Sequence, residues 1–317
     1  MKQAFFHWTK TPLVELDQTL LTKLGVEVSV KRLDLNHPVY GGNKLLKLWP
    51  LFSRDKDELK SRGVISMGGP HSNHLFSLAG LCHELKVPLT VIVRGERPLA
   101  PTYVIRQLEK WGTELRFVSR DEFRDWRENG ASMASRVSDA IWLPEGGGDG
   151  KTNDAFKNLM EEWYEQGLRK EDHLVLASGT GGTLAGLVPH IEKGQHILLI
   201  NAVPNFPVTI NLEKWCGEKL SGLNIEILET SGLGRFGTVT DDLVKFAWNW
   251  QSENRIPLDP IYTARIFFTI WQLLKDQRGT FSGKRLSVLH TGGMAGAFSW
   301  EHKTGMEFIP RDIRPDI

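Results

Sequence analysis

Lys44 stands in a setting that suggests chemistry, because two glycines and an asparagine directly precede it. The chain reads Gly41-Gly42-Asn43-Lys44 and continues as the apolar, helix-compatible run LLKLW. Glycine permits tight turns and close approach of the backbone. We therefore interpret Lys44 as an amine held in place by a turn, and a placed amine can form a Schiff base or carry protons.

Four glycine-rich segments follow predicted strands: SMGGPHSNH, PEGGGDGKT, ASGTGGTLAG and LHTGGMAG. In open α/β sheets, ligands bind where strands end and helices begin. A single glycine turn is explained by tight turning alone, but four of them predict that at least one lets the backbone approach a ligand. Glycine density peaks at Glu145 to Gly150, which we interpret as a hinge.

The segment SGTGGTLAGL, residues 178–187, is the strongest candidate for an anion site. Small residues before a helix leave backbone N–H groups free, and the helix dipole favours a phosphate there. The residues of this expected phosphate loop are Ser178, Gly179, Thr180, Gly181, Gly182 and Thr183. A capped helix start without a ligand is the alternative.

Two nucleotide motifs fit the chain poorly. Gly179 and Gly181 match the first half of a dinucleotide fingerprint, but Leu184 occupies its third glycine position. The tripeptide GKT at residues 150–152 matches the end of a P-loop, whereas Glu145 stands where its first glycine is required. A phosphate-bearing cofactor that is not a dinucleotide fits better.

Short β-like runs alternate with helical periods along the whole chain. Expected strands are residues 63–69, 88–95, 113–119, 139–148, 172–182, 195–205, 224–230 and 285–293. Helices are expected over residues 75–85, 103–110 and 153–167. This alternation is typical of α/β proteins with parallel sheets covered on both faces.

Bulk composition points to a globular, cytoplasmic protein. The 317 residues are 40% hydrophobic and 24% charged, with a net charge of +1, which argues against nucleic acid or a membrane as the main partner. Only Cys82 and Cys216 occur, so a reducing compartment is expected. No run approaches the roughly 20 apolar residues of a membrane span.

Five motifs in order resemble one family. GGNKLLKL, GGPHSNH, GTGGT, DPIYTA and LHTGG are similar to motifs of the 1-aminocyclopropane-1-carboxylate deaminase and D-cysteine desulfhydrase family. The resemblance spans nearly the whole chain. It implies a two-domain, three-layer αβα fold of the tryptophan-synthase-β-like type (fold type II), and pyridoxal 5'-phosphate as the cofactor.

The resemblance also implies a division of the chain. A larger cofactor-binding domain would comprise residues 1–47 and 149–317, and a smaller inserted α/β domain residues 48–148, with the active site in the cleft between them. The implied partner is a small amino-acid substrate, and the implied assembly is a homodimer. The implied reaction class is that of a lyase or hydrolase acting on amino acids.

Residue roles follow from the same resemblance. Lys44 would hold the cofactor as a Schiff base, and Ser72 and Tyr262 would act on the substrate. The implied cofactor contacts are Asn73, Ser178, Gly179, Thr180, Gly181, Gly182, Thr183, Thr263, Thr291 and Gly292. The implied substrate contacts are Ser72, Asn73, His74, Tyr262 and Phe236. Ser72 and Asn73 could instead be ordinary helix N-caps.

Two positions favour a desulfhydrase. By resemblance, Thr263 falls at the position where the deaminases carry a glutamate beside the pyridine nitrogen of the cofactor. A carboxylate there favours a protonated, strongly electron-withdrawing ring, and a neutral hydroxyl does so to a smaller degree. Phe236 falls where an active-site tyrosine is expected, and phenylalanine cannot transfer a proton. We therefore expect D-cysteine desulfhydrase-like β-elimination to pyruvate, ammonia and sulfide, with 1-aminocyclopropane-1-carboxylate deamination to 2-oxobutyrate as the alternative.

Three other interpretations remain. His71 and His74 lie at helical spacing, but no third ligand is evident, so no metal is expected. A P-loop-like nucleoside triphosphatase would use GGGDGKT. A catalytically inactive protein that binds pyridoxal phosphate would keep the motifs without turnover.

Overall fold

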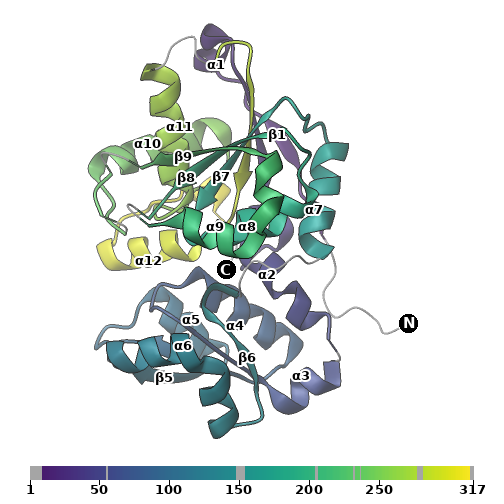
Figure 1. Cartoon of the computed structure of the whole chain (residues 1–317). Helices are drawn as coiled ribbons and strands as arrows, with labels where there is room; N and C mark the ends of the chain where they lie inside the picture. Colours follow the sequence, from purple (N-terminus) through teal and green to yellow (C-terminus); the bar gives the residue numbers. More distant parts are fainter. Residues whose placement is uncertain are drawn as a thin grey trace.

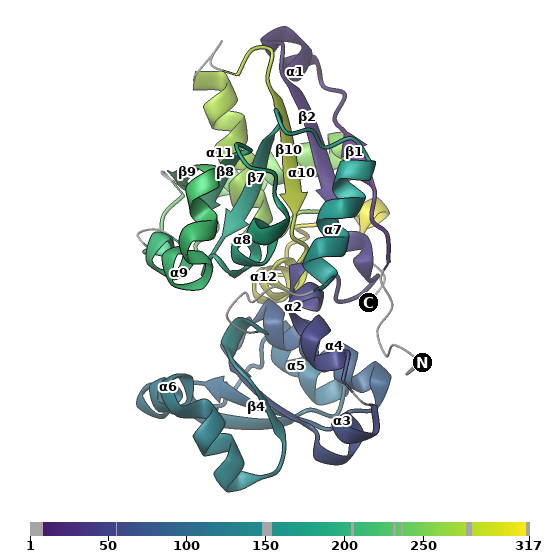
Figure 2. The ribbon, with the colours of Figure 1, turned by 45° about the vertical axis from the view of Figure 1, so that its right-hand side comes forward.

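The chain forms two α/β bodies, seen above and below one another in Figures 1 and 2. The structure is a computed structural model that describes residues 9–54, 56–147, 154–203, 206–230, 233–235, 237–276 and 281–314. Each body is built on its own sheet, with the strand orders β1-β2-β10-β7-β8-β9 and β5-β4-β3-β6 among these residues. The expected αβα layering is confirmed.

The larger sheet combines the two ends of the chain. Its strands are β1 (Leu13–Glu15), β2 (Glu27–Arg32), β7 (His173–Ser178), β8 (His196–Asn201), β9 (Asn224–Glu229) and β10 (Arg285–His290). All neighbours run parallel except β1, which pairs antiparallel with β2. The expected parallel sheet is confirmed except at this edge, where β1 runs antiparallel because it reaches β2 through the short helix α1 (Thr19–Leu24) rather than a full crossover.

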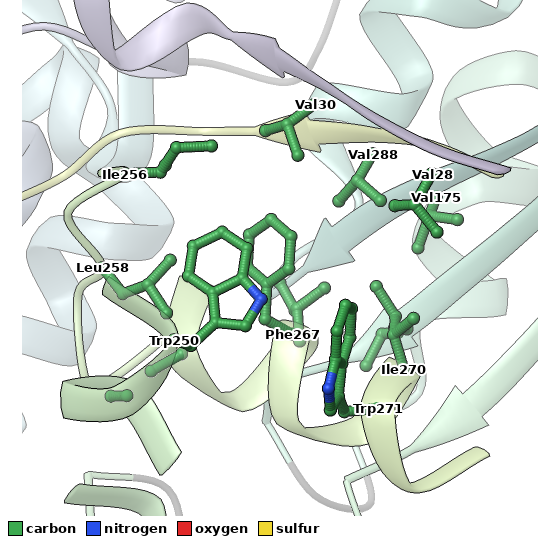
Figure 3. Close-up of a cluster of buried hydrophobic side chains, with 14 of the residues drawn as sticks. Val28, Val30, Val175, Trp250, Ile256, Leu258, Phe267, Ile270, Trp271 and Val288 are labelled. Carbon is green, nitrogen blue, oxygen red and sulfur yellow. The ribbon is translucent and has the colours of Figure 1, made fainter. Parts of the chain in front are cut away.

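Alternation along β7 explains the three layers of the larger body. Val175 faces a core shared with α1, α10 (Asp241–Asn254), α11 (Thr263–Asp276) and α12 (Ala295–Thr304). Leu174 and Leu176 face the opposite core, under α7 (Asp154–Glu165), α8 (Gly182–Leu187) and α9 (Val208–Cys216). Figure 3 shows the first core, where Trp250 and Phe267 pack beneath the valines of the sheet.

The smaller sheet has helices on both faces too. Its strands are β3 (Val64–Gly68), β4 (Leu89–Arg94), β5 (Glu114–Val118) and β6 (Ile141–Leu143), all parallel. One face packs under α2 (Asn43–Phe52), α3 (Lys56–Arg62), α4 (Asn73–Leu85) and α5 (Tyr103–Lys110). The other packs against α6 (Arg120–Val137).

Helix α2 joins the two bodies. It contacts α4 of the smaller body and α7 of the larger one, and Figure 2 shows it between the two sheets. Helix α12 of the larger body also contacts α4 and α5. Because α2 begins with Asn43 and Lys44, the residue singled out first from the sequence lies at this junction. Short 3-10 segments connect other elements: η1 (Leu33–Asn36), η2 (Glu145–Gly147), η3 (Val188–His190), η4 (Gly217–Gly222) and η5 (Arg311–Ile313).

Each predicted strand contains a strand of the structure and each predicted helix overlaps a helix, but some strands are shorter than predicted: within 139–148, Ile141–Leu143 forms β6 and Glu145–Gly147 forms η2, and Gly182, at the end of 172–182, begins α8. Residues 103–110 form α5, and the strands expected over 63–69 and 88–95 are β3 and β4. Within the described residues, no helix is long and apolar enough to cross a membrane.

Candidate active site

The glycines before Lys44 let two backbone segments touch. Gly42 has a φ of 126°, and a Cβ placed there would clash with the carbonyl oxygen of Thr291. Gly42 forms a bridge with Gly292, and the N–H of Asn43 donates to Thr291 O at 2.9 Å. A Cβ on Gly292 would lie 2.6 Å from Gly41 O. The turn therefore fixes the start of α2 against the loop that follows β10.

Asparagine side chains hold the same turn. Asn36 Oδ1 accepts from Gly42 N at 2.8 Å. The Nδ2 of Asn43 donates to Thr183 Oγ1 at 2.8 Å, which ties α2 to the expected phosphate loop after β7. Three expected site segments, around Lys44, Thr183 and Thr291, are thus brought together.

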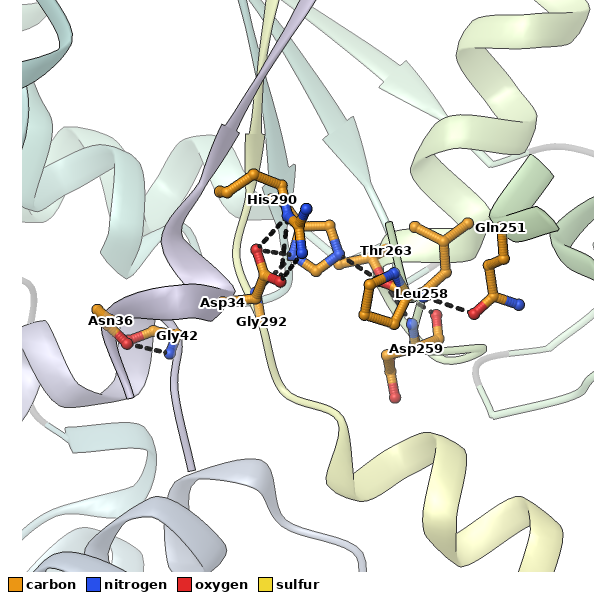
Figure 4. A network of polar contacts seen from close by, with 11 residues as sticks. Asp34, Asn36, Gly42, Gln251, Leu258, Asp259, Thr263, His290 and Gly292 are labelled. Carbon is orange, nitrogen blue, oxygen red and sulfur yellow. Dashed lines mark hydrogen bonds and ion pairs between the residues drawn. The ribbon is translucent and has the colours of Figure 1, made fainter. Parts of the chain in front are cut away.

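A buried charged network lies behind this turn (Figure 4). His290 Nδ1 lies 3.2 Å from Asp34 Oδ1 and 3.2 Å from Gly292 N, and His290 Nε2 is 2.7 Å from Pro257 O. Burial alone would raise the pKa of Asp34, but His290 and Arg32 bring that pKa well below its ordinary value. Sequence analysis did not single out this network, which links β2 to β10 at the site.

Lys44 and Lys47 place two amines on one side of α2, since residues three apart are neighbours on a helix. Burial lowers the pKa of Lys44 to about 8, against the opposing attraction of Glu145. Burial and the repulsion of Lys44 lower the pKa of Lys47 well below its ordinary value. Both amines are therefore more readily neutral than a surface lysine.

Lys47 was missed by the sequence analysis, although its spacing from Lys44 could have revealed it. A Cβ placed on Gly182 would lie 2.6 Å from Lys47 Nζ, so the amine points at the expected phosphate loop. No acidic residue in the described ranges pairs with it. In the same loop, Ser178 Oγ is buried without a hydrogen-bond partner among those residues. A buried amine without an acidic partner among the described residues and an unsatisfied hydroxyl at one loop suit an anion, whose charge would favour the protonated amine.

Three other residues of the expected phosphate loop, Gly179, Thr180 and Gly181, contact α9 or Tyr262. Gly181 has a φ of 90°, and a Cβ there would lie 2.9 Å from Val208 Cγ2. Gly179 faces Tyr262, whose Cε1 would lie 3.6 Å from a Cβ on that glycine. Thr180 is exposed, and its carbonyl accepts from Asn211 Nδ2 at 3.0 Å.

The start of α4 brings Ser72, Asn73 and His74 to the same junction. Ser72 Oγ accepts from Leu75 N at 3.2 Å, which makes Ser72 the N-cap of α4 and leaves its hydroxyl hydrogen able to donate elsewhere. A Cβ on Gly293 would lie 2.7 Å from Asn73 Nδ2. Asn73 Oδ1 is buried with no hydrogen-bond partner among the described residues.

His74 points into the smaller body. Its Nε2 lies 2.9 Å from Ser66 Oγ on β3, and Nδ1 is buried without a partner in the described part of the chain. Burial and the charges of Lys44 and Lys47 lower the pKa of His74 to about 3. The imidazole is therefore neutral. Among the described residues, no group of three or more possible ligands could hold a metal ion.

Asp259 organises the segment with Tyr262 and Thr263. Its Oδ1 accepts from Ile261 N at 3.0 Å and from Tyr262 N at 2.7 Å. Burial raises the pKa of Asp259 to about 7, against these hydrogen bonds and the charge of Arg265. Thr263 Oγ1 accepts from Asp259 N at 2.6 Å.

The Tyr262 hydroxyl is held in its protonated form. Burial raises the pKa of Tyr262 well above its ordinary value, and Asp259 and Glu145 add to that rise. Three of the sequence predictions fall on residues that the structure does not describe: Phe236, part of the expected hinge at residues 145–150, and the GKT tripeptide at residues 150–152.

Comparisons with known proteins agree with this arrangement. The family of pyridoxal-phosphate dependent enzymes matches residues 4–292. The chain belongs to this family. It is 28% identical over 312 residues to a protein of Pyrococcus furiosus named putative 1-aminocyclopropane-1-carboxylate deaminase, covering 93% of this chain and 92% of that one. A bifunctional D-cysteine desulfhydrase/1-aminocyclopropane-1-carboxylate deaminase of Arabidopsis thaliana, described as mitochondrial, is 23% identical and covers 90% and 80%.

A solved structure supports the same assignment. The crystal structure of a 1-aminocyclopropane-1-carboxylate deaminase homologue superposes with a TM-score of 0.74 at 25% identity and covers 94% of each chain. The resemblance derived from the five motifs is confirmed, and the protein is a pyridoxal 5'-phosphate-dependent enzyme of the fold type II kind.

The described side chains fit this cofactor. The buried amine of Lys47 and the unsatisfied Ser178 hydroxyl lie at the glycine loop that would receive its phosphate. The unsatisfied Asn73 Oδ1 lies in the same junction. Lys44, with its lowered pKa, is an amine suited to the aldehyde.

Proposed function

We propose that the protein catalyses β-elimination from a small amino acid, most favourably D-cysteine, to give pyruvate, ammonia and sulfide. Names of the relatives include both D-cysteine desulfhydrase and 1-aminocyclopropane-1-carboxylate deaminase. Thr263 is the observation that favours the former. It begins α11 with a neutral hydroxyl that is engaged by the backbone of Asp259. Elimination of a good leaving group needs less electron withdrawal than opening an unactivated cyclopropane.

The proposed reaction is balanced with water. D-cysteine and one water give pyruvate, ammonia and hydrogen sulfide: the bond from Cβ to sulfur breaks, and the released enamine is hydrolysed in solution. Because the bond to the leaving group breaks without water, the reaction belongs to the lyases, and the expected hydrolase class is not supported.

Pyridoxal phosphate, when bound, supplies an electron sink that stabilises negative charge at Cα. We propose that Lys44 holds it and that, once freed, the Lys44 amine removes the Cα proton. A pKa of about 8 leaves part of that amine neutral near pH 7.5, as a base requires. Lys47, Ser178 and the loop to Thr183 would bind the phosphate.

We propose that substrate-facing residues come from both bodies. Ser72 can donate its hydroxyl hydrogen to a carboxylate while it caps α4. Tyr262 stays protonated and can hydrogen-bond the leaving group. Asn73 would contact the cofactor ring, and Thr263, Thr291 and Gly292 would complete its wall. For His74 we propose a backbone contact to the substrate carboxylate, because its ring is turned toward Ser66.

The proposal also covers the domain boundaries, the assembly and the location of the protein. We propose domain boundaries at residues 47–48 and 148–149, supported by the gathering of β3 to β6 in one sheet. We also propose a cytoplasmic location, since Cys82 and Cys216 are free thiols, as a reducing compartment favours. The homodimer is proposed from the resemblance to the family alone. Light scattering of the purified protein tests the dimer.

Assays with a panel of substrates test the function. The cofactor-loaded enzyme is incubated with D-cysteine, L-cysteine, D-serine and 1-aminocyclopropane-1-carboxylate, and pyruvate and 2-oxobutyrate are measured. We expect pyruvate and sulfide from D-cysteine to exceed every other product, and Lys44→Ala to abolish them. Faster 2-oxobutyrate formation would establish the deaminase instead. Bound cofactor without any turnover would favour an inactive pyridoxal phosphate-binding protein.

A further inference from the structure

Asn43 is held from two sides at the start of α2. Its backbone N–H donates to Thr291 O at 2.9 Å, and Gly42 before it forms a bridge with Gly292. Its side-chain Nδ2 donates to Thr183 Oγ1 at 2.8 Å, in the first turn of α8. Because the turn anchors the backbone of Asn43 independently, the side-chain amide reaches Thr183 from a fixed starting point.

The Thr183 hydroxyl is buried and has one hydrogen to donate. Thr183 is only 6% exposed. A hydroxyl carries one hydrogen and can accept two hydrogen bonds. The amide of Asn43 occupies one of the accepting positions, and this hydroxyl makes no second hydrogen bond within the described residues. The hydroxyl hydrogen therefore points away from Asn43 and is left to donate elsewhere.

Lys47 reaches the same loop from the same side of α2. Asn43 and Lys47 are four residues apart and are therefore neighbours on the helix surface. A Cβ on Gly182, the residue before Thr183, would lie 2.6 Å from Lys47 Nζ. At the start of the loop, Ser178 Oγ is buried without a hydrogen-bond partner in the described part of the chain. The remaining hydrogen of Thr183 thus belongs to a set of donors at the loop that the cofactor phosphate would meet.

We propose that Asn43 is a positioning residue for the cofactor phosphate and that it acts through Thr183. The Asn43 amide fills an accepting position of the Thr183 hydroxyl, so the hydroxyl hydrogen is presented to the phosphate and is not consumed inside the protein. The position requires a donor, because an aspartate there would accept the same hydrogen. This inference rests on the proposed binding of the phosphate by the loop to Thr183, and it does not depend on the substrate or on the reaction.

A comparison of pyridoxal 5'-phosphate with pyridoxal isolates the contribution of the phosphate. Each aldehyde is titrated into the cofactor-free protein at one pH, and binding is followed by the visible absorption band. The dissociation constant of pyridoxal divided by that of pyridoxal phosphate measures the phosphate contribution, and any change at Lys44 alters both constants. Asn43→Ala should lower this ratio roughly 2- to 10-fold, the scale of one neutral hydrogen bond.

Asn43→Asp separates this role from a structural one. An acidic residue suits the first turn of a helix, so a residue that only stabilised the start of α2 could be replaced by aspartate without loss. We expect the ratio to fall in Asn43→Asp, because the carboxylate takes up the Thr183 hydrogen and repels the phosphate. Asn211→Ala is the matched control. Asn211 Nδ2 donates to Thr180 O at 3.0 Å in the same loop, and a carbonyl has no hydrogen to orient, so the ratio should stay nearly unchanged.

Thr183→Val decides whether Asn43 acts through the hydroxyl. This change removes the hydroxyl and should lower the ratio by itself, and Asn43→Ala should then lower it no further, since coupled residues are not additive. An equal fall from Asn43→Ala in both backgrounds would overturn the inference, and so would an unchanged ratio in Asn43→Asp. An unchanged ratio in Thr183→Val alone would instead remove Thr183 from the phosphate, and with it that part of the proposed function.

Discussion

Replacing Lys47 by methionine should weaken cofactor binding while stabilising the cofactor-free protein. The Lys47 amine is buried at the Gly182 loop, and its pKa is lowered by burial and by Lys44. A hydrogen bond to a charged group contributes about 1.5–3 kcal/mol. At about 1.4 kcal/mol for each factor of ten, Lys47→Met should raise the dissociation constant of pyridoxal phosphate roughly 10- to 150-fold.

The opposite effect is expected without cofactor, because methionine removes the cost of burying an amine that has no acidic partner among the described residues. Equilibrium titration of the cofactor-free protein, followed by the visible band, measures the dissociation constant, and thermal melts measure stability. Lys23→Met, an exposed change on α1, is the control. Unchanged cofactor affinity in Lys47→Met would refute the assignment of this lysine to the phosphate.

Three further predictions concern the turn and the titrating groups. Gly42→Ala should lower the free energy of unfolding, measured with denaturant, by about 2–4 kcal/mol, because the added methyl group clashes with Thr291 O at a residue that already has a positive φ. Gly112→Ala should lower it by only about 1 kcal/mol, because Gly112 has a φ of 76° but open space around it. Covalent capture of pyridoxal phosphate should accelerate with pH and level off above about 8, since only the neutral Lys44 amine reacts; a rate independent of pH between 6 and 9 contradicts that pKa. The pKa of His74 is about 3 when folded and 6.5 in its ordinary state, so the unfolded chain binds the extra proton between these values. The stability that neutral His74 contributes is present above pH 6.5 and is lost as the pH falls, by up to about 1.4 kcal/mol of unfolding free energy per pH unit. His74→Gln should therefore reduce the dependence of the unfolding free energy on pH, measured between about pH 6.5 and 4.5.

Much of the fold could be predicted from local pattern. The run VISMG is apolar on both faces and ends in glycine, which predicts a buried parallel strand before a turn, and β3 is such a strand. The antiparallel β1 could not be predicted in this way, because three residues carry too little periodicity and their pairing with β2 is decided by the register across the turn. Position in a sheet is a tertiary property.

The site was predictable where sequence neighbours act together. Gly41 to Lys44 form one turn, and its logic is visible in the residues themselves. The contribution of His290 and Asp34 was not visible, since they lie 256 positions apart and meet only because β10 pairs with β2. The sequence indicates Glu145 as the start of an expected hinge and as a mismatch to a P-loop, and its relation to Lys44 depends on how the two bodies meet.

Trapping the cofactor on the chain tests the central claim most directly. The cofactor-loaded protein is reduced with borohydride, digested and examined by mass spectrometry. We predict one pyridoxyl phosphate group per chain, on Lys44, and none in Lys44→Ala. Label on Lys47 or on another lysine, or no label in a protein that has taken up cofactor, would contradict the account.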